Sequence, residues 1–313
     1  MDRHDVDWRG YFAAVPTPFN EDGSLALDLL RELLELYVRE GLHGVLIEGT
    51  TGEWFSQSPE ERRLVAQTAV ETIDGRIPVI VACTDYTADL VAGHARGALE
   101  AGANGVAATP PPYAKPFREE IVAWYQDISA KVDAPLMIYN WPHGTSVEID
   151  TELAQELVEI ETVVAFKDST PNVEQFYASS RAVVDRVRVF GPYMTPAGLE
   201  QLERYGGDGT IGGGSLFLRA DAEFWEAHWR GDHDAALAHA VRNERLFPKL
   251  WLPGGWAGRH GHYASELKAL MAILGQPGGT VRRPRLPITD PAKLEEMRAI
   301  LAEEGLVPAG AGR

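Results

Sequence analysis

The stretch Thr162-Val163-Val164-Ala165-Phe166-Lys167-Asp168 decides the fold class, because a continuous apolar run ends abruptly on two charged residues. A short run of this kind is typical of a strand buried on both faces of a parallel sheet. A lysine at the end of such a strand lies where a barrel enzyme keeps its chemistry. Partial burial would lower the pKa of the Lys167 amine and favour Schiff-base formation. The same pattern also suits a lysine that only ends the strand and reaches solvent.

Similar short runs recur along the chain, and each is followed by a longer stretch that suits a helix. They cover residues 11–15, 44–47, 78–82, 105–108, 136–139, 163–167, 187–190 and 209–211. Strands that alternate with helices predict right-handed βαβ units and a parallel sheet, and eight such units fill a (β/α)₈ TIM barrel of about 250 residues. A doubly wound sheet is the alternative fold. It usually has a glycine-rich nucleotide loop after its first strand, where this chain has Pro16-Thr17-Pro18.

The residues beyond the eighth run predict a helical extension. Helical patterns cover residues 220–246, 264–274 and 291–304, and one of them would supply the last barrel helix. We therefore expect an α/β fold with a barrel core over residues 1–220. Residues 221–313 would hold the final barrel helix and a C-terminal helical region of the same unit, frayed over 305–313.

Composition excludes several classes of function. The 313 residues include 29 basic and 46 acidic side chains, a net charge of -17, which argues against nucleic acid and anionic membranes as partners. No apolar run is long enough to predict a membrane-spanning helix, and the polar residues 1–10 do not predict a signal peptide. Cys83 is the only cysteine, so no internal disulfide or cysteine metal cluster is expected. The cytoplasm is the expected location.

The loop Gly49-Thr50-Thr51-Gly52 follows the second predicted strand. Its glycines allow a sharp turn and a close approach to a ligand, while the threonine hydroxyls and main-chain N–H groups suit a small carboxylate. An ordinary strand-to-helix turn would look the same. Ser58, Pro59 and Glu61 predict a capping box that starts the next helix, so the loop is longer than a turn requires.

Two tyrosines and an asparagine stand at other strand ends. Tyr139 ends the fifth strand, next to the strand of Lys167 in a barrel, where a phenol can move protons. A packed tyrosine with a satisfied hydroxyl is the alternative, and Asn140 is expected to be structural. Tyr113 follows Pro110-Pro111-Pro112, and a tyrosine on so stiff a loop suits a lid or a subunit contact.

The histidines do not predict a metal site. His260 and His262 have no carboxylate at ligand spacing, and His228, His233 and His239 share one helical stretch without one-turn spacing. No glycine-rich phosphate loop with a following lysine is present.

Three motifs in this order resemble the dihydrodipicolinate synthase / N-acetylneuraminate lyase family. They are Gly49–Glu53, Tyr139-Asn140-x-Pro142 and Phe166–Ser169, supported by residues 16–19, the Tyr113 loop and residues 267–287. The resemblance runs from about residue 10 to 305. It implies a (β/α)₈ barrel with a C-terminal helical region, a homotetramer or homodimer, and no metal or organic cofactor.

The resemblance also implies roles. Lys167 would form a Schiff base with a 2-oxo acid, usually pyruvate, whose carboxylate Thr50 and Thr51 would hold. Tyr139 would shuttle protons, and Tyr113 would lend its hydroxyl across a subunit interface. The pocket would be lined by Gly52, Gly191 and Ile211.

The chain departs from the family pattern at the second substrate. Members that make dihydrodipicolinate place a carboxylate-gripping arginine where this chain has Gly144, and an acidic pair where it has Pro192-Tyr193. We expect an aldehyde or sugar-acid portion without the usual carboxylate, or one gripped by His143. The aromatic residues expected to line this side of the pocket are Trp54, Phe55, Trp141 and Tyr193.

The leading hypothesis is a class I lyase that performs aldol cleavage, condensation or dehydration on a 2-oxo acid, such as a 2-keto-3-deoxy acid. One alternative is 4-hydroxy-tetrahydrodipicolinate synthase, which condenses pyruvate with aspartate semialdehyde. A second is a non-catalytic paralogue that binds a 2-oxo acid. The presence of Thr50, Thr51, Tyr139 and Lys167 together argues against it, since binding alone does not need the amine. A metal-dependent barrel lyase is the third.

Overall fold

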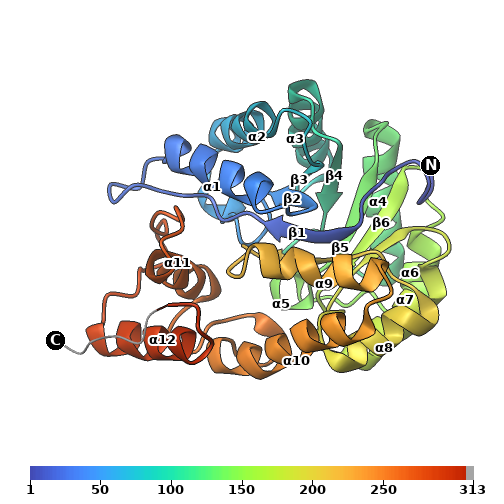
Figure 1. Cartoon of the computed structure of the whole chain (residues 1–313). Coiled ribbons are helices and arrows are strands. Elements are labelled where there is room, and N and C mark those ends of the chain that lie inside the picture. The colour runs from blue at the N-terminus through green and yellow to red at the C-terminus, as the bar shows by residue number, and fades with distance from the viewer. Residues whose placement is uncertain (308–313) are drawn as a thin grey trace.

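Eight parallel strands close into a single barrel in sequence order (Figure 1). The computed structural model describes residues 1–307. The strands are β1 Gly10–Ala14, β2 Gly44–Ile47, β3 Val79–Ala82, β4 Gly105–Ala108, β5 Leu136–Asn140, β6 Val163–Asp168, β7 Arg188–Phe190 and β8 Gly209–Gly213. All eight predicted strands are present, and β8 pairs with β1 to close the barrel. The TIM-barrel prediction is confirmed, and the doubly wound alternative is wrong.

Helices connect successive strands and form the outer layer of the barrel (Figure 1). They are α1 Leu27–Arg39, α2 Pro59–Ile73, α3 Ala88–Ala101, α4 Arg118–Lys131, α6 Thr151–Leu157, α7 Val173–Val183 and α8 Pro196–Tyr205, with short turns η1 Trp54–Ser56 and α5 Pro142–Thr145. The predicted capping box of α2 is present: Ser58 Oγ accepts from the Glu61 amide, and the Ser58 amide donates to the Glu61 carboxylate. Helix α2 therefore starts at Pro59, as the sequence predicts.

Strand alternation divides the core into two parts. An inner cluster fills the barrel and includes Phe12, Leu46, Met137, Ala165 and Phe190. A larger cluster lies between the strands and the helices. Because successive side chains point to opposite faces, the residues two positions beyond Met137 and Ala165, at the carboxyl ends of β5 and β6, point into the barrel mouth.

The C-terminal region corrects one prediction. Residues 220–246 do not form one helix, because the chain turns at Gly231, whose φ of 73° is a left-handed conformation that glycine adopts without strain. This turn separates α9 Arg219–Trp229 from α10 His233–Leu250. Helix α9 packs on β1 and completes the barrel layer.

The extension consists of α10, α11 Tyr263–Ile273 and α12 Pro291–Glu303, with η2 Pro253–Gly255 between α10 and α11 (Figure 1). Helices α11 and α12 match their predicted ranges within one residue. Of the tail expected to fray, residues 308–313 lie outside the described residues. Over residues 1–307, no helix has both the length and the apolar character needed to cross a bilayer.

Candidate active site

Lys167 lies inside the mouth of the barrel. Its side chain is buried, with 5% of its surface exposed. The amine Nζ donates to Ser169 Oγ at 3.2 Å and lies 3.3 Å from the centroid of the Tyr139 ring. Burial lowers the pKa of the Lys167 amine well below its usual value, while the nearby Asp168 carboxylate opposes the shift. A buried amine with a lowered pKa is a stronger nucleophile at neutral pH than an ordinary lysine.

Tyr139 is the direct neighbour of Lys167 across the β5–β6 pairing. The phenol is buried, and burial raises its pKa to about 12, although the neighbouring hydroxyls of Thr50 and Ser169 oppose the rise. Tyr139 is therefore protonated at neutral pH, with its hydroxyl among the hydroxyls of Thr50 and Ser169. This arrangement gives the site a short set of groups that can pass a proton.

Asn140 and Asp168 face away from the barrel interior and fix the ends of β5 and β6. Asp168 Oδ1 accepts from Asn140 Nδ2 and from the Thr170 amide, both at 2.9 Å. Asn140 Oδ1 in turn accepts from the Ile149 amide at 3.1 Å. Burial raises the pKa of Asp168 to about 7. Asn140 thus has the structural role that the sequence predicts.

The threonine loop turns back on itself after β2. The Gly52 amide donates to the Gly49 carbonyl at 2.9 Å, and a Cβ on Gly52 would lie 3.2 Å from the backbone of Glu48. Thr51 is buried and Thr50 is partly exposed beside the Tyr139 phenol. The loop therefore lies next to the Lys167–Tyr139 pair, as the sequence predicts.

A buried ion pair anchors the end of this loop. Glu53 has a φ of 56° and no exposed surface, and its Oε1 accepts from Lys268 Nζ at 2.7 Å. Lys268 also donates to the carbonyls of Thr17 and Thr280, both at 2.7 Å. Three distant segments of the chain are joined at one ammonium, which holds the threonine loop in place.

The remaining predicted residues are spread around the mouth. Ile211 packs against the inner cluster, and Gly191 leaves room for Phe176, since a Cβ there would lie 2.1 Å from the Phe176 ring. His143 is exposed and packs edge-to-face on Trp141 with 5.5 Å between ring centroids. Tyr113 is 91% exposed on its proline-rich loop, with a φ of 71°.

The expectation for Tyr193 is wrong. Its side chain is fully buried in the outer core between Phe176 and Trp225, and its hydroxyl bonds to Ser180 Oγ at 2.5 Å. Tyr193 follows β7 where the chain already turns outward toward α8, so it packs behind the barrel and does not line a substrate pocket.

Two residues of the site were not singled out from the sequence. Ser169 contacts both Lys167 and Tyr139. Because residues two positions apart in an extended segment lie on the same side, its position after Lys167 could have predicted this contact. Tyr263 begins α11, and its hydroxyl reaches Gly213 at the end of β8, where a Cβ would lie 1.6 Å away. Nothing local in the sequence places Tyr263 there, because the contact joins segments far apart in the chain.

Within the described residues, no group of three or more histidine, cysteine, aspartate or glutamate side chains is placed to hold a metal ion. The predicted histidine stretch is divided between α9 and α10. His260 is buried against the Glu266 carboxylate at 2.7 Å.

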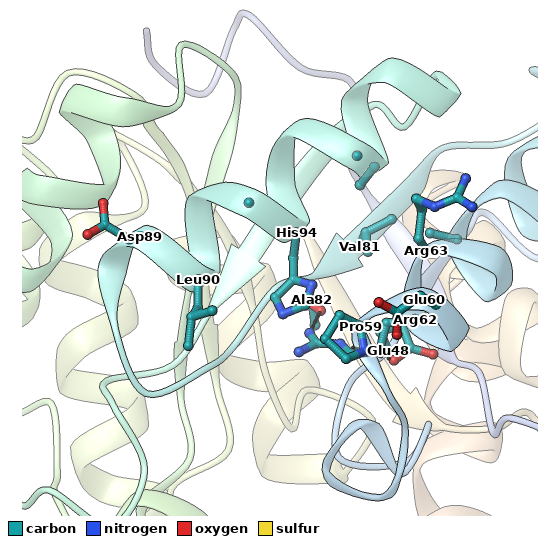
Figure 2. Close-up of a pocket in the computed structure, with 14 residues that line it drawn as sticks. Glu48, Pro59, Glu60, Arg62, Arg63, Val81, Ala82, Asp89, Leu90 and His94 are labelled. Carbon is teal, nitrogen blue, oxygen red and sulfur yellow. Dashed lines mark hydrogen bonds and ion pairs between the residues drawn. The ribbon is translucent and has the colours of Figure 1, made fainter.

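A cavity of about 330 Å³ lies away from Lys167, between α2 and α3 (Figure 2). Its lining includes Glu48, Arg62 and His94, which Figure 2 shows near one another. Glu48 lies 3.5 Å from Arg62 Nε, and burial raises the pKa of Glu48 to about 7. None of the predicted site residues lines this cavity.

Comparison with known proteins identifies the family. Residues 7–303 match the model of the dihydrodipicolinate synthetase family. The chain belongs to the dihydrodipicolinate synthetase family. Its members are lyases of the class I aldolase type, and this chain is one of them. The resemblance seen in the motifs is thus confirmed.

Individual relatives cover nearly the whole chain. A Rhizobium meliloti protein named "Uncharacterized DapA-like lyase" is 34% identical over 91% of this chain and 92% of its own length. The 4-hydroxy-tetrahydrodipicolinate synthase of Bartonella bacilliformis is 30% identical over 96% of this chain and 99% of its own length. The crystal structure of dihydrodipicolinate synthase from Aquifex aeolicus aligns with a TM-score of 0.84 at 27% identity, covering 96% of this chain and 99% of that one.

Proposed function

We propose that this protein is a Schiff-base-forming lyase in which Lys167 attacks the ketone of a 2-oxo acid, with pyruvate as the first candidate. The observation that carries the proposal is the buried Lys167 amine, whose pKa is lowered and which lies against Tyr139 and Ser169 beside the threonine loop. A lowered pKa increases the unprotonated fraction of the amine at any given pH, and nucleophilic attack on a carbonyl requires the unprotonated form.

The chemistry follows from these groups. Lys167 Nζ adds to the ketone carbon, the ketone oxygen leaves as water after two proton transfers, and a protonated imine remains. The imine withdraws electrons, so the adjacent methyl group loses a proton and becomes a nucleophilic enamine carbon. That carbon forms a bond to an aldehyde carbon, and the aldehyde oxygen takes up a proton. Water then cleaves the imine and releases the product and the free amine. Cleavage is the same sequence in reverse.

The neighbouring residues have defined tasks in this proposal. Tyr139 passes protons to and from the departing oxygen, with Ser169 as its relay. Thr50 and Thr51 hold the carboxylate through their hydroxyls and the main-chain N–H groups of the turn, which Gly52 keeps tight. Gly191 and Ile211 border the pocket on the β7 and β8 side. No metal or organic cofactor takes part, and we expect activity to be unaffected by a chelator.

Trapping with borohydride tests the proposal. The protein is incubated with pyruvate and sodium borohydride, and its intact mass and peptides are measured by mass spectrometry. A reduced pyruvate adduct that maps to Lys167 and disappears in Lys167→Ala supports the mechanism. If pyruvate and a panel of larger 2-oxo acids give no adduct, the mechanism is wrong and the non-catalytic binding alternative takes its place.

The synthase alternative is weakened by the structure around position 144. A Cβ on Gly144 would lie 2.2 Å from Cδ1 of Trp141, so the indole occupies the space that an arginine there would need. Gly144→Arg alone therefore does not test the missing-arginine argument, and Trp141→Ala/Gly144→Arg is the appropriate variant. Gain of aspartate-semialdehyde condensation in the double variant only would support the argument. Efficient condensation by the wild-type protein would establish the synthase activity instead.

We also propose a homo-oligomer, a tetramer or dimer, in the cytoplasm. Large apolar side chains are exposed on the connections after the adjacent strands β3 and β4: Tyr86, Leu90, Tyr113 and Phe117, at 62%, 47%, 91% and 76%. Several such side chains on neighbouring connections suit a protein contact surface, and in the proposed assembly Tyr113 reaches a neighbouring subunit's site. Sedimentation analysis of wild type and Tyr113→Asp tests this. A wild-type protein that is monomeric at micromolar concentration would contradict it.

A further inference from the structure

An aromatic surface leads out of the barrel from the Lys167 site. Tyr139 points into the barrel mouth, and by strand alternation Trp141 continues on the same side just beyond β5. The rings of Tyr139 and Trp141 are stacked, with 6.4 Å between centroids and an interplanar angle of 26°. Lys167 Nζ lies 3.3 Å from the centroid of the Tyr139 ring, so Tyr139 contacts both the amine and Trp141.

Two more rings extend this surface toward solvent. His143 lies edge-to-face on Trp141 at 5.5 Å, and Trp256 from the loop before α11 lies 6.1 Å from His143. Trp256 is 46% exposed and Trp141 is partly exposed. Side chains from two distant segments therefore form one aromatic wall, defined as Trp141, His143 and Trp256.

Glycines make room for the aromatic wall. At Gly144 a side chain would collide with the Trp141 indole, and at Gly254 a Cβ would lie 3.1 Å from His143 Nε2. Within residues 1–307, no lysine or arginine lies over the rings of Trp141 or Trp256. Tyr139 and His143 cover part of the Trp141 indole, and the exposed remainder of the wall is aromatic surface with no cation over it, which suits an uncharged planar group better than a carboxylate.

We propose that the aromatic wall determines specificity for the second substrate and binds an aldehyde that carries a planar aromatic ring. This inference rests on the proposed function, since Lys167 must first form the enamine. The exposed part of the Trp141 indole contacts the ring of the aldehyde and places the aldehyde carbon beside the enamine carbon, while His143 and Trp256 cover the outer part of that ring. Benzaldehyde is the probe, and acetaldehyde is the matched small aldehyde without a ring.

The expected result is a preference that depends on Trp141. Pyruvate and benzaldehyde combine to 4-hydroxy-2-oxo-4-phenylbutanoate, the methyl proton of pyruvate ending on the aldehyde oxygen. We expect kcat/KM for benzaldehyde to exceed that for acetaldehyde by about 10- to 200-fold, the range that a fitted apolar group supplies. Trp141→Ala should remove most of this ratio, mainly by raising KM for benzaldehyde, and Trp141→Phe should retain part of it. Trp256→Ala should have a smaller effect in the same direction.

Two controls separate the possible causes. Trp229 pairs with His43 near Gly10, at the amino end of β1 and so on the opposite side of the barrel, and Trp229→Ala should leave the ratio unchanged. Borohydride trapping of pyruvate on Trp141→Ala reports the lysine chemistry without a second substrate. A normal adduct together with equal use of both aldehydes by the wild type overturns the aromatic-wall inference alone. Absence of any adduct in the wild type overturns the proposed function and this inference with it.

Discussion

Lys167→Met is expected to stabilise the fold while it abolishes imine formation. Lys167 is 95% buried, and within the described residues the one hydrogen bond of its amine is the 3.2 Å contact with Ser169. An unfolded lysine has a pKa of about 10.4 and binds a proton at pH 7, whereas the folded protein resists protonation of Lys167. Proton uptake therefore favours the unfolded state. The penalty is full below the lowered pKa and disappears as the pH rises toward the pKa of the unfolded chain.

The size of the effect follows from general magnitudes. Replacement of buried ionic groups by apolar side chains of similar volume often raises stability by about 1–4 kcal/mol. Methionine also keeps a favourable sulfur contact with the Tyr139 ring. With an unfolding entropy of about 2.1 cal/mol/K per residue, a chain of 313 residues would gain about 1.5–6 °C in Tm.

Lys268→Met is the matched control, and we expect it to lower the stability of the fold. Lys268 is as buried as Lys167, but its amine donates hydrogen bonds of 2.7 Å to Glu53, Thr17 and Thr280. Its removal leaves the fully buried Glu53 carboxylate without its ionic partner, which costs about 3–5 kcal/mol. Tm should fall by about 5–8 °C. The two lysines differ in hydrogen bonding, and that difference determines whether replacement by methionine raises or lowers the stability of the fold.

Thermal unfolding followed by circular dichroism at pH 7 and pH 9.5 measures both effects. The gain for Lys167→Met should be larger at pH 7 than at pH 9.5, and the same samples should show no borohydride adduct. A Lys167→Met protein that melts below the wild type at pH 7, or a gain that does not shrink at pH 9.5, would refute the argument that burial penalises the Lys167 ammonium.

Three further outcomes are expected. Tyr139→Phe should slow adduct formation about 10²- to 10⁴-fold, measured by borohydride trapping over time, because the relay loses its hydroxyl; an unchanged rate would remove Tyr139 from the proton path. Gly191→Ala should cost about 1–3 kcal/mol in urea unfolding, since the new methyl group meets the buried Phe176 ring; a neutral effect would mean that the ring can shift freely. Cys83 is buried, which raises its pKa to about 12, so a thiol reagent at pH 8 should label it only after unfolding; rapid labelling of the native protein would contradict the burial.

The sequence predicts those features that depend on local periodicity. The apolar run 163–166 fixes a strand, alternation places Lys167 inside, and barrel topology puts Tyr139 beside it. The break at Gly231 is signalled in the sequence, because residues 230–234 have no apolar side chain and Gly231 and Asp232 are typical of a helix end and a helix start, but the helical patterns on both sides obscure it. Contacts such as Lys268 with Glu53 join residues 215 positions apart, and no local pattern encodes them.

The second-substrate side shows why a missing residue is hard to interpret from sequence alone. Gly144 shows by itself only that no side chain is available to pair with a carboxylate. In the fold, Gly144 and Trp141 share one volume, since a Cβ at position 144 would meet the indole ring at 2.2 Å. The glycine is therefore what allows the indole to stack beside Tyr139, and its role is to make space for a ring. The space that an arginine side chain would need at position 144 is filled by the Trp141 indole. In the proposed function, this indole contacts an aromatic aldehyde in place of a carboxylate-bearing one.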